Sequence, residues 1–425
     1  MKQYEEYKDS GIQWWGNIPD NWCLSKAKHM FSLVNENVSS PDLPKVALEN
    51  IESWTGRYTE TANDFMGEGV EFHPNDILFG KLRPYLAKVY KAEFKGQSVG
   101  DIYVFRGNEN QDPGFLKYLF LSYPFISVVD GSTYGAKMPR ANWDFISQMI
   151  LPCPPLSEQQ SIASYLDYKV GQIDAVISEK EKMLEDLKAY RSAIISESVT
   201  KGLDKNVEMK DSGIEWIGMI PKDWSVNKLR YLSSIYTGST PSTTIDKYWT
   251  NPINNWYTPS DFNDDDIYLA QSARKVSDVA FSENACRVFN ENVVLVVAIG
   301  ATLGKVGISR FVCSSNQQIN GIEFSSDVLP LFGAYYLSSL KEVMKSVSNV
   351  ATLAIMNQSV TGDLMFVTPP INEQKKIVEY LEQKIGFIKE SLIEIKQQIS
   401  DLKSYKSSLI TEAVTGKIDL RDWKK

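Results

Sequence analysis

The chain has 425 residues, of which 43% are hydrophobic and 23% are charged, and its formal net charge is −8. This length exceeds one ordinary domain and suits two domains of about 150 residues each, with connectors. The acidic balance argues against a non-specific nucleic-acid coat, which would be basic, but it does not exclude a specific reader that concentrates positive charge in a few loops.

The sequence offers neither a metal site nor a membrane segment. The longest apolar run, VVLVVAIGA from Val293 to Ala301, has the size of a buried strand and falls short of the ~18 residues that span a bilayer. The first residues, MKQYEEYKDS, lack the apolar core of a signal peptide. The cysteines and histidines are scattered without a CxxC pair: Cys23, Cys153, Cys286, Cys313, His29 and His73. We therefore expect a cytoplasmic protein with no zinc cluster and no disulfide framework.

One phrase near the start of the chain occurs twice. KDSGIQWWGNIPDNW begins at Lys8, and KDSGIEWIGMIPKDW begins at Lys210, an offset of 202 residues. Internal repetition of this kind decides the architecture before any local motif is considered. It predicts a leader over residues 1–22 and a second copy of that leader over 202–224.

The segment after the first leader contains a basic turn. Residues Asp76 to Lys95 hold five lysines and arginines against two acids, a local charge of +3. Within this stretch FGKLRPYLAK reads as strand, turn, strand, because a glycine and a proline bracket the first basic residues. Basic side chains on such a turn can contact phosphates or base edges, and a solvated hairpin turn is the alternative. The candidate contacts are Lys81, Arg83, Tyr85 and Lys88.

A second candidate loop, TYGAKMPRANW, runs from Thr133 to Trp143. Its glycine frees the backbone, its lysine and arginine are donors, and its tyrosine could stack or bond a phosphate. An ordinary loop that leads into the last strand is the alternative. The candidate contacts are Tyr134, Lys137 and Arg140.

Two long helical patterns align without a gap at an offset of 215 residues, one after PPLSEQQ at Pro154 and one after PPINEQK at Pro369. Prolines ahead of a Ser or Asn cap are helix-start signals. Apolar residues then recur in steps of four and three, which is the coiled-coil pattern, and two core helices of one domain are the alternative. The positions expected to pair the helices include Ile162, Leu166, Ile173, Ile177, Leu184, Leu187, Ile377, Leu381, Ile388, Leu392, Ile399 and Leu402.

The segment between the second leader and the second helix is polar rather than basic. AIGATLGKVGIS, from Ala298, is the counterpart of the basic turn and carries fewer charges. Asn and Gln side chains further on suit the paired donor and acceptor of adenine, and amides that join turns within the fold are the alternative. The candidate contacts are Thr302, Lys305, Gln317, Gln318, Asn357 and Gln358.

No stretch of the chain has the residues of a catalytic site. GATLGKVG imitates a phosphate-binding loop, but three residues rather than four separate Gly300 from Gly304, and Val306 stands where a Ser or Thr would hold magnesium. With two histidines there is no convincing Ser/His/Asp set. We therefore predict no catalytic residue and no metal ligand.

The repeats define the order of the parts. Leader, variable segment and helix occur twice, while the two variable segments show no comparable alignment. The predicted parts are a leader (1–22), a first variable domain (23–155), a central helix (156–201), a repeated leader (202–224), a second variable domain (225–368), a second helix (369–416) and a tail (417–425). Pseudo-twofold duplication predicts that the tail lies near the N-terminal leader.

This order resembles the specificity subunit of a type I restriction-modification enzyme, in which two target-recognition domains alternate with two helices. The phrases that carry the resemblance include SGIEWIGMIPKDW, NDILFGKLRPYLAKVY, GSTYGAKMPRANWDFI, STPSTTIDKYW, SNQQINGI and PPINEQKKIVEYL, and they extend over essentially the whole chain. The resemblance implies an α+β fold, with two globular α/β target-recognition domains joined by two long antiparallel coiled-coil helices in a pseudo-twofold internal duplication.

The resemblance also implies a function. Each target-recognition domain would read one half of a bipartite, asymmetric site on double-stranded DNA. Two copies of a methyltransferase subunit would dock on the chain and methylate adenine, and restriction subunits would join optionally. S-adenosylmethionine would then sit on the methyltransferase, and ATP and Mg on the restriction subunit. The alternative is a two-headed protein–protein adaptor, which the acidic charge favours.

Overall fold

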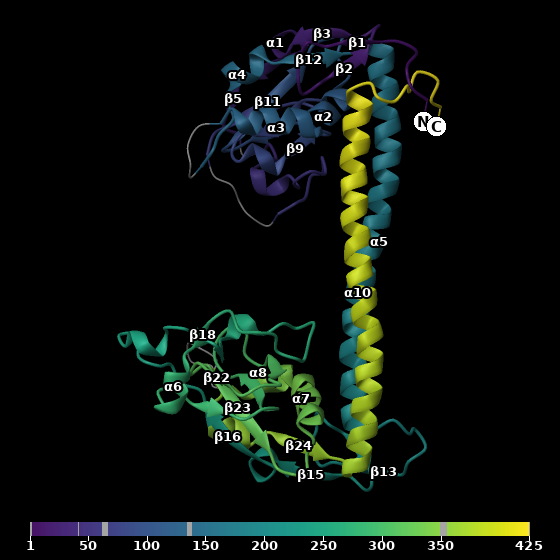
Figure 1. Cartoon of the computed structure of the whole chain (residues 1–425). Coiled ribbons are helices and arrows are strands. Elements are labelled where there is room, and N and C mark those ends of the chain that lie inside the picture. The colour runs from purple at the N-terminus through teal and green to yellow at the C-terminus, as the bar shows by residue number, and fades with distance from the viewer. Residues whose placement is uncertain (1, 41, 62–66, 134–137, 349–354, 425) are drawn as a thin grey trace. The chain divides into compact units, whose positions relative to one another are not determined.

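The computed structural model describes residues 2–40, 42–61, 67–133, 138–348 and 355–424. The chain divides into two compact units, Met1–Glu181 with Gln397–Lys425 and Lys182–Lys396. Each unit combines one variable domain with part of each of two long helices, α5 (Leu156–Lys201) and α10 (Ile371–Val414), as Figure 1 shows. The predicted α+β class is therefore confirmed.

In the first unit, the beginning of α5 packs against the end of α10 in the antiparallel direction. Lys406 Nζ lies 2.8 Å from Asp174 Oδ1, and Lys180 Nζ donates to Gln398 Oε1 at 2.6 Å, so residue numbers rise on one helix as they fall on the other. The apolar positions with the three-four spacing avoid solvent in this unit. Ile162, Leu166, Ile173, Ile177 and Ile399 are buried, and Leu402 is half-buried.

The second unit holds the other two helix parts, again antiparallel. One apolar cluster joins Ile194 and Val199 near the end of α5 to residues near the beginning of α10. Burial of this cluster is what stabilises the helices, since a polar face alone would not hold them together. The paired positions in the cluster are Ile377, Leu381, Ile388 and Leu392, with Leu184 and Leu187 packed against it.

The first variable domain contains two four-stranded sheets, with strand orders β4-β11-β8-β9 and β5-β7-β10-β6. A further pair, β3 with β12, joins the beginning of the domain to its end. The strands are β3 (Cys23–Lys26), β4 (Phe31–Val34), β5 (Asn37–Val38), β6 (Lys45–Val46), β7 (Gly69–Phe72), β8 (Ile77–Gly80), β9 (Val89–Lys91), β10 (Gly96–Ser98), β11 (Ile102–Gly107) and β12 (Ile150–Cys153). The helices are α1 (Ala27–Met30), α2 (Pro113–Leu121), α3 (Tyr123–Gly131) and α4 (Trp143–Gln148).

The second variable domain shares most of this strand framework. Its sheets have the orders β16-β23-β20-β21 and β18-β17-β22-β19, and β15 pairs with β24. The strands are β15 (Ser225–Lys228), β16 (Ser233–Thr237), β17 (Asn254–Tyr257), β18 (Lys275–Val276), β19 (Val288–Phe289), β20 (Val294–Val297), β21 (Val306–Ile308), β22 (Cys313–Ser315), β23 (Ile319–Phe324) and β24 (Met365–Thr368). The helices are α6 (Asp278–Ser282), α7 (Pro330–Ser339), α8 (Lys341–Val347) and α9 (Gln358–Gly362).

The two domains share strand pairings even where their sequences do not align. The parallel pair β10–β6 corresponds to β22–β17, and the antiparallel pair β10–β7 corresponds to β22–β19. The fourth strand differs, because β5 pairs with β7 in the first domain whereas β18 pairs with β17 in the second. Duplication therefore extends through the domains, and their sequences have diverged on a common framework.

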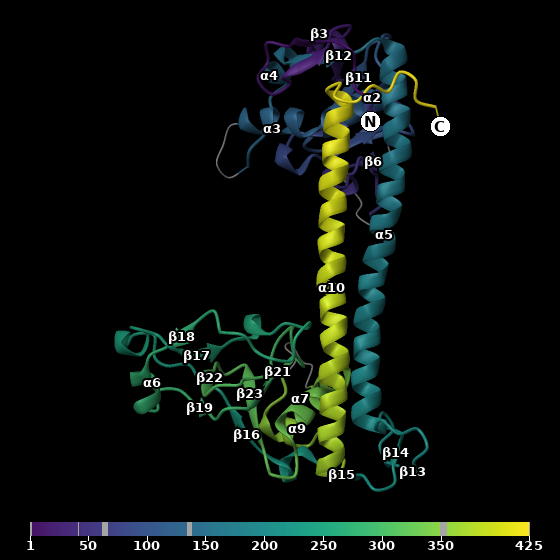
Figure 2. The same cartoon turned by 45° about the vertical axis from the view of Figure 1, so that its right-hand side comes forward.

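Each domain is anchored to α5 or α10 within its own unit. Figure 2 shows α7 on the side of the second domain that faces α10. Tyr335 of α7 donates a hydrogen bond to Glu382 of α10, and Leu329 N, at the start of α7, donates to Gln374 Oε1 at 2.8 Å. In the first domain, Tyr118 donates to Asp167 Oδ1 at 2.8 Å. Burial raises the pKa of Tyr118 and Tyr335, so both remain neutral donors at physiological pH.

The two leaders form equivalent hairpins, β1 (Tyr7–Asp9) with β2 (Asn17–Pro19) and β13 (Met209–Asp211) with β14 (Met219–Pro221). Each ends on a buried tryptophan. Trp224 donates through Nε1 to Glu373 Oε2 at 2.9 Å, at the start of α10. Glu158 at the start of α5 has other partners, because Tyr4 donates to its Oε1 and Asn21 donates to its Oε2 at 3.1 Å.

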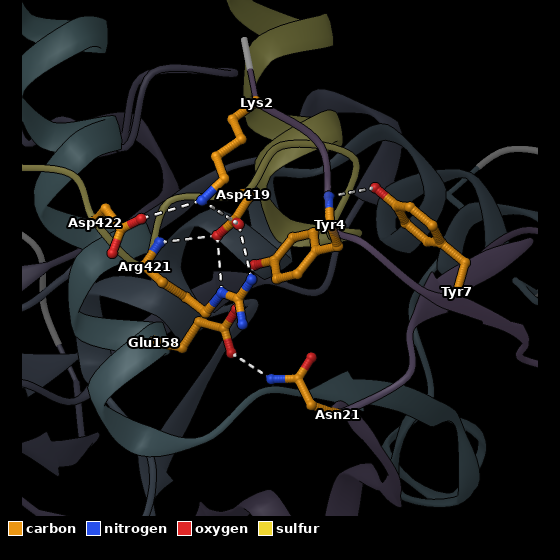
Figure 3. A network of polar contacts seen from close by, with 8 residues as sticks. All are labelled: Lys2, Tyr4, Tyr7, Asn21, Glu158, Asp419, Arg421 and Asp422. Atoms are coloured by element: carbon orange, nitrogen blue, oxygen red, sulfur yellow. Dashed lines mark hydrogen bonds and ion pairs between the residues drawn. The ribbon is translucent and has the colours of Figure 1, made fainter.

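The C-terminal tail lies against the N-terminal leader, as Figure 3 shows. Asp419 N donates to Lys2 O at 2.9 Å, and the carboxylate of Asp419 accepts two hydrogen bonds from the guanidinium of Arg421, at 3.0 Å and 2.8 Å. Lys2 Nζ is 3.1 Å from Asp422 Oδ2 and 3.7 Å from Asp419 Oδ2. The Asp419 side chain is 1% exposed, so these contacts hold a buried carboxylate at the junction of the two ends.

Replacing Asp419 with asparagine is expected to lower the free energy of unfolding by about 1–2 kcal/mol near neutral pH. Hydrogen bonds from Arg421, followed by the charges of Arg421 and Lys2, hold the pKa of Asp419 below its usual 3.8. A carboxylate with a lowered pKa stabilises the fold above its unfolded-state pKa, and this contribution is lost as pH falls through the folded-state pKa. Thermal unfolding of both proteins should therefore differ from pH 5 to 7, and the difference should vanish well below pH 3.8. A difference that stays constant with pH would contradict this role.

Candidate nucleic-acid interface

In the first domain the two predicted loops are brought together by backbone hydrogen bonds. The turn between β8 and β9 begins at Lys81, and residues 139–141 cross it. Arg83 N donates to Pro139 O at 2.8 Å, and Ala141 N donates to Lys81 O at 2.8 Å. Leu82 and Arg140 form an antiparallel bridge. Two candidate stretches that are far apart in sequence thus form one surface.

One carboxylate organises the charges on this surface. Asp101 accepts two hydrogen bonds from Arg140, both at 3.1 Å, and Lys81 Nζ lies 3.7 Å from it. The hydrogen bonds and charge of Asp101 raise the pKa of Arg140. Lys81 also lies 5.4 Å from the ring centre of Tyr103. Asp101 therefore orients two cations that sequence reasoning had chosen, although it was not itself a candidate.

Arg83 has a backbone conformation that is unusual for its residue type. Its φ is +52°, in the left-handed region that favours glycine, and the conformation costs about 1 kcal/mol for a residue with a Cβ atom. Its side chain is exposed, and the described residues give its guanidinium no hydrogen bond or ion pair. Beside it, Tyr85 is 46% exposed, and its carbonyl accepts from Trp54 Nε1 at 3.0 Å.

The second domain repeats this arrangement of backbone. Ala298 N donates to Gln318 O at 2.8 Å, as Lys81 N donates to Asp101 O at 2.9 Å in the first domain. Met356 N donates to Ala298 O at 2.8 Å, as Ala141 does to Lys81. The counterpart relationship that was expected between the two turns is therefore confirmed by their hydrogen bonds.

We call this backbone arrangement the frame: a turn after β8 or β20, crossed by the segment that ends at Ala141 or Met356. The side chains on the two equivalent frames differ in chemistry. The bridge Leu82–Arg140 becomes Ile299–Ile355, and Arg83 is replaced by Gly300, whose φ is +95°. The frame of the first domain therefore carries charged side chains, Arg83 and Arg140 among them. At the equivalent positions the second domain has uncharged residues, Gly300 and Ile355. In the second domain, polar groups are offered instead by exposed side-chain amides near the frame in sequence.

Two of those amides are held by threonine hydroxyls. Thr240 Oγ1 donates to Gln317 Oε1 at 2.7 Å, and Gln358 Nε2 donates to Thr237 Oγ1 at 3.0 Å. Gln317 and Gln358 are both exposed. Neither threonine was a candidate from the sequence. They lie in a stretch with many Ser and Thr residues, and the sequence does not indicate which hydroxyl bonds a given amide.

Four other candidates have their polar groups engaged within the domains. Lys88 Nζ donates to Leu48 O at 2.5 Å, and burial lowers the pKa of Lys88. Lys305 Nζ donates to Phe262 O at 3.1 Å and lies 3.7 Å from Asp264. For the remaining pair, Gln318 and Asn357, the structure favours the alternative, in which the amides hold local turns rather than face a ligand. Gln318 accepts from Asn316 at 3.0 Å, and Asn357 caps α9 through Val360 N at 2.9 Å.

Three candidates remain. Thr302 is half-buried, and its carbonyl accepts from Lys305 N at 3.2 Å inside the turn. Tyr134 and Lys137 lie outside the described residues. An unforeseen feature is Arg274, whose guanidinium lies 4.7 Å and 5.0 Å from the ring centres of Trp249 and Trp256. Nothing near Arg274 in the sequence marks it, because both tryptophans come from earlier segments of the chain.

The described part of the chain shows no group of three or more His, Cys, Asp or Glu residues that could hold a metal ion. In that same part, no helix combines the length and the apolar character needed to cross a membrane. Burial raises the pKa of the thiol of Cys313 to about 12, so this thiol is a neutral core group rather than a nucleophile.

Comparison with known proteins agrees with this architecture. Residues 221–400 match the family described as "Type I restriction modification DNA specificity domain". The putative type I restriction enzyme MjaX specificity subunit of Methanocaldococcus jannaschii is 23% identical over 98% of this chain and 97% of its own length. The MjaIX specificity subunit of the same organism is 32% identical, over 39% of this chain and 38% of its own length.

A solved structure shares the fold. A chain from a study of complex assembly and conformational transition of the type I R-M system has a TM-score of 0.75 and 18% identity, and the match covers 94% of this chain and 99% of that one. Together with the duplicated domains and helices, these likenesses show that the chain is similar along its whole length to specificity subunits of type I restriction enzymes, and residues 221–400 match the specificity-domain family itself.

Proposed function

We propose that the chain reads a bipartite, asymmetric site on double-stranded DNA, one half with each variable domain, and so directs adenine methylation by partner subunits. The observation that carries this proposal is the pair of equivalent frames with different side chains. One framework that presents Arg83 and Arg140 in the first domain, and amides in the second, has the chemistry of two readers with two specificities.

The first domain offers cations to its half-site. Arginine suits guanine, whose O6 and N7 both accept hydrogen bonds, and it also suits phosphates. Asp101 holds Arg140 and Lys81 in place before DNA arrives, which reduces the entropy lost on binding. The second domain offers Gln317 and Gln358, side chains that suit adenine.

The catalytic steps belong to partners in this proposal. Two copies of a methyltransferase subunit, each with S-adenosylmethionine, would dock on the duplicated scaffold, and a restriction subunit with ATP and Mg would join optionally. The target adenine must leave the base stack before it is methylated, and that step falls to the methyltransferase. We propose a non-catalytic, cytoplasmic subunit as the form in which the chain acts.

Methylome sequencing tests this function. A host that expresses the chain with its neighbouring methyltransferase is expected to gain a split adenine motif. Exchanging residues 225–368 for the corresponding domain of a relative should change one half of that motif and leave the other half unchanged. If the assembled, soluble complex methylates no new motif, the adaptor alternative would replace this proposal. Salt-sensitive DNA binding of the complex separates the two functions independently.

A further inference from the structure

A chain of hydrogen bonds in the second domain leads from a buried backbone carbonyl to the exposed amide of Gln358. Asn320 on β23 is 1% exposed. Its Nδ2 donates to Met356 O at 3.0 Å and to Thr361 Oγ1 at 2.9 Å. Thr237 Oγ1 donates to Asn320 Oδ1 at 2.8 Å, and Gln358 Nε2 donates to Thr237 Oγ1 at 3.0 Å.

The chemistry of these groups allows one direction of donation. A carbonyl can only accept, so the atom of Asn320 that faces Met356 O must be its NH2 group. Thr361 uses its own proton on Asn357 O at 2.9 Å, so its oxygen also accepts from Asn320. The Oδ1 atom of Asn320 therefore faces Thr237 and accepts the single proton of that hydroxyl.

The orientation of Gln358 follows from the same count. Thr237 has given its proton to Asn320, so its oxygen can only accept from Gln358. The group of Gln358 that faces Thr237 must then be the NH2 group, and its Oε1 faces outward as an acceptor. Turning the amide over would place Oε1 against a hydroxyl oxygen with no proton to give, and this leaves a hydrogen bond unmade.

We infer that Thr237 and Asn320 are positioning residues that preset Gln358 to read a base carrying an exocyclic amino group, adenine N6 or cytosine N4, in the major groove. The inference rests on the proposed function and deepens it. The second hydrogen of Nε2 remains available, so a bidentate contact with adenine N6 and N7 is possible. Guanine presents only acceptors on this edge, so the outward carbonyl of Gln358 discriminates against it.

The chain supplies two internal comparisons. Among the described residues, the Gln317 amide bonds Thr240, and that hydroxyl can donate or accept, so the Gln317 amide can adopt either orientation. In the first domain, Tyr103 takes the place of Asn320, and its hydroxyl donates to Ala141 O at 3.1 Å, where the chain of hydrogen bonds ends. A preset amide is therefore a property of Gln358 alone among these positions.

The test combines protein variants with base analogues in one DNA site. The full chain, in complex with its methyltransferase, is titrated with duplexes that carry the methylome-defined site. Gln358→Ala first identifies the base pair that Gln358 contacts. At that pair, purine replaces adenine, or 2-pyrimidinone replaces cytosine, so that only the amino group is removed. Wild-type binding is expected to weaken roughly tenfold, and Gln358→Ala is expected to abolish this sensitivity.

The positioning role has its own variants. Thr237→Val should reduce the sensitivity to amino-group removal, because the amide is then free to turn over. Thr237→Ser keeps the hydroxyl and should retain the sensitivity, as should the matched control Thr240→Val. If Thr237→Val does not fold, Thr237→Ser and Gln358→Ala still carry the test.

Two results would overturn the inference while leaving the proposed function in place. The first is amino-group sensitivity that Gln358→Ala leaves unchanged at every base pair of this half-site. The second is that Gln358→Ala abolishes sensitivity to 7-deaza substitution, which removes the N7 acceptor, but not sensitivity to removal of the amino group. This would show that the Gln358 amide donates to the base rather than accepts from it. A wild-type complex with no site-specific binding would overturn the proposed function itself, and the inference with it.

Discussion

Replacing Asp174 with alanine is expected to lower the free energy of unfolding by about 3–5 kcal/mol, because it leaves a buried cation without its partner. Asp174 on α5 lies 2.8 Å from Lys406 Nζ on α10 and 3.0 Å from Arg57 of the first domain. The side chains of Asp174 and Lys406 are 8% and 9% exposed. Chemical denaturation of the full chain measures the loss.

The same helix pair supplies a matched control. Glu181 lies 3.2 Å from Lys403, but these side chains are 55% and 56% exposed, so Glu181→Ala should cost no more than about 1 kcal/mol. Replacing Asp174 and Lys406 together with methionine should recover most of the lost stability, because burying apolar groups avoids the desolvation of ions. Equal losses for Asp174→Ala and Glu181→Ala would contradict this account.

Replacing Arg83 with glycine is expected to weaken or relax one half-site by about 1–3 kcal/mol and to leave the other half-site unchanged. Glycine fits the left-handed backbone at this position, as Gly300 does in the second domain, so the change removes the guanidinium without straining the turn. Folding stability should stay the same or rise slightly. The measurement is the change in the methylated motif, together with a binding titration against mutated half-sites.

Lys95→Ala is the control for this variant. It removes the same charge from the same domain, but Lys95 is held by Glu71 at 2.8 Å and belongs to neither of the two loops that form the surface. It should leave the motif unchanged. If Arg83→Gly instead weakens binding to all sequences equally and flattens the salt dependence, Arg83 contacts phosphate rather than a base. No effect at either half-site would remove it from the interface.

The basic turn and the loop before α4 were separate candidates in the sequence, with a solvated turn or an ordinary loop as alternatives. Whether they meet depends on hydrogen bonds between Arg83 and Pro139 and between Ala141 and Lys81, which involve backbone atoms alone. Backbone pairing leaves no residue-type signal at such distances along the chain. The common strand framework of the two domains could not be seen in the sequence either. Strand pairing is kept while the side chains on the strands change, so the two sequences no longer align.

The amides show a different limit. Sequence reasoning chose Gln317, Gln318, Asn357 and Gln358 as one group, because all four carry a donor and an acceptor. In the structure, the side-chain oxygens of Gln318 and Asn357 accept hydrogen bonds from their own turn and helix, while Gln317 and Gln358 are exposed and bond threonine hydroxyls. Which amide joins a turn and which faces solvent depends on neighbours that come from other strands.

The sequence by itself determined the order of the parts and the two helices, because duplication and three-four spacing are periodic signals that survive in the order of residues. Only the tertiary structure decided that the two loops of the first domain form one surface and that both domains share one frame of backbone hydrogen bonds. Those features rest on contacts between distant segments, and the direction in which Gln358 presents its amide follows from a buried carbonyl on another segment.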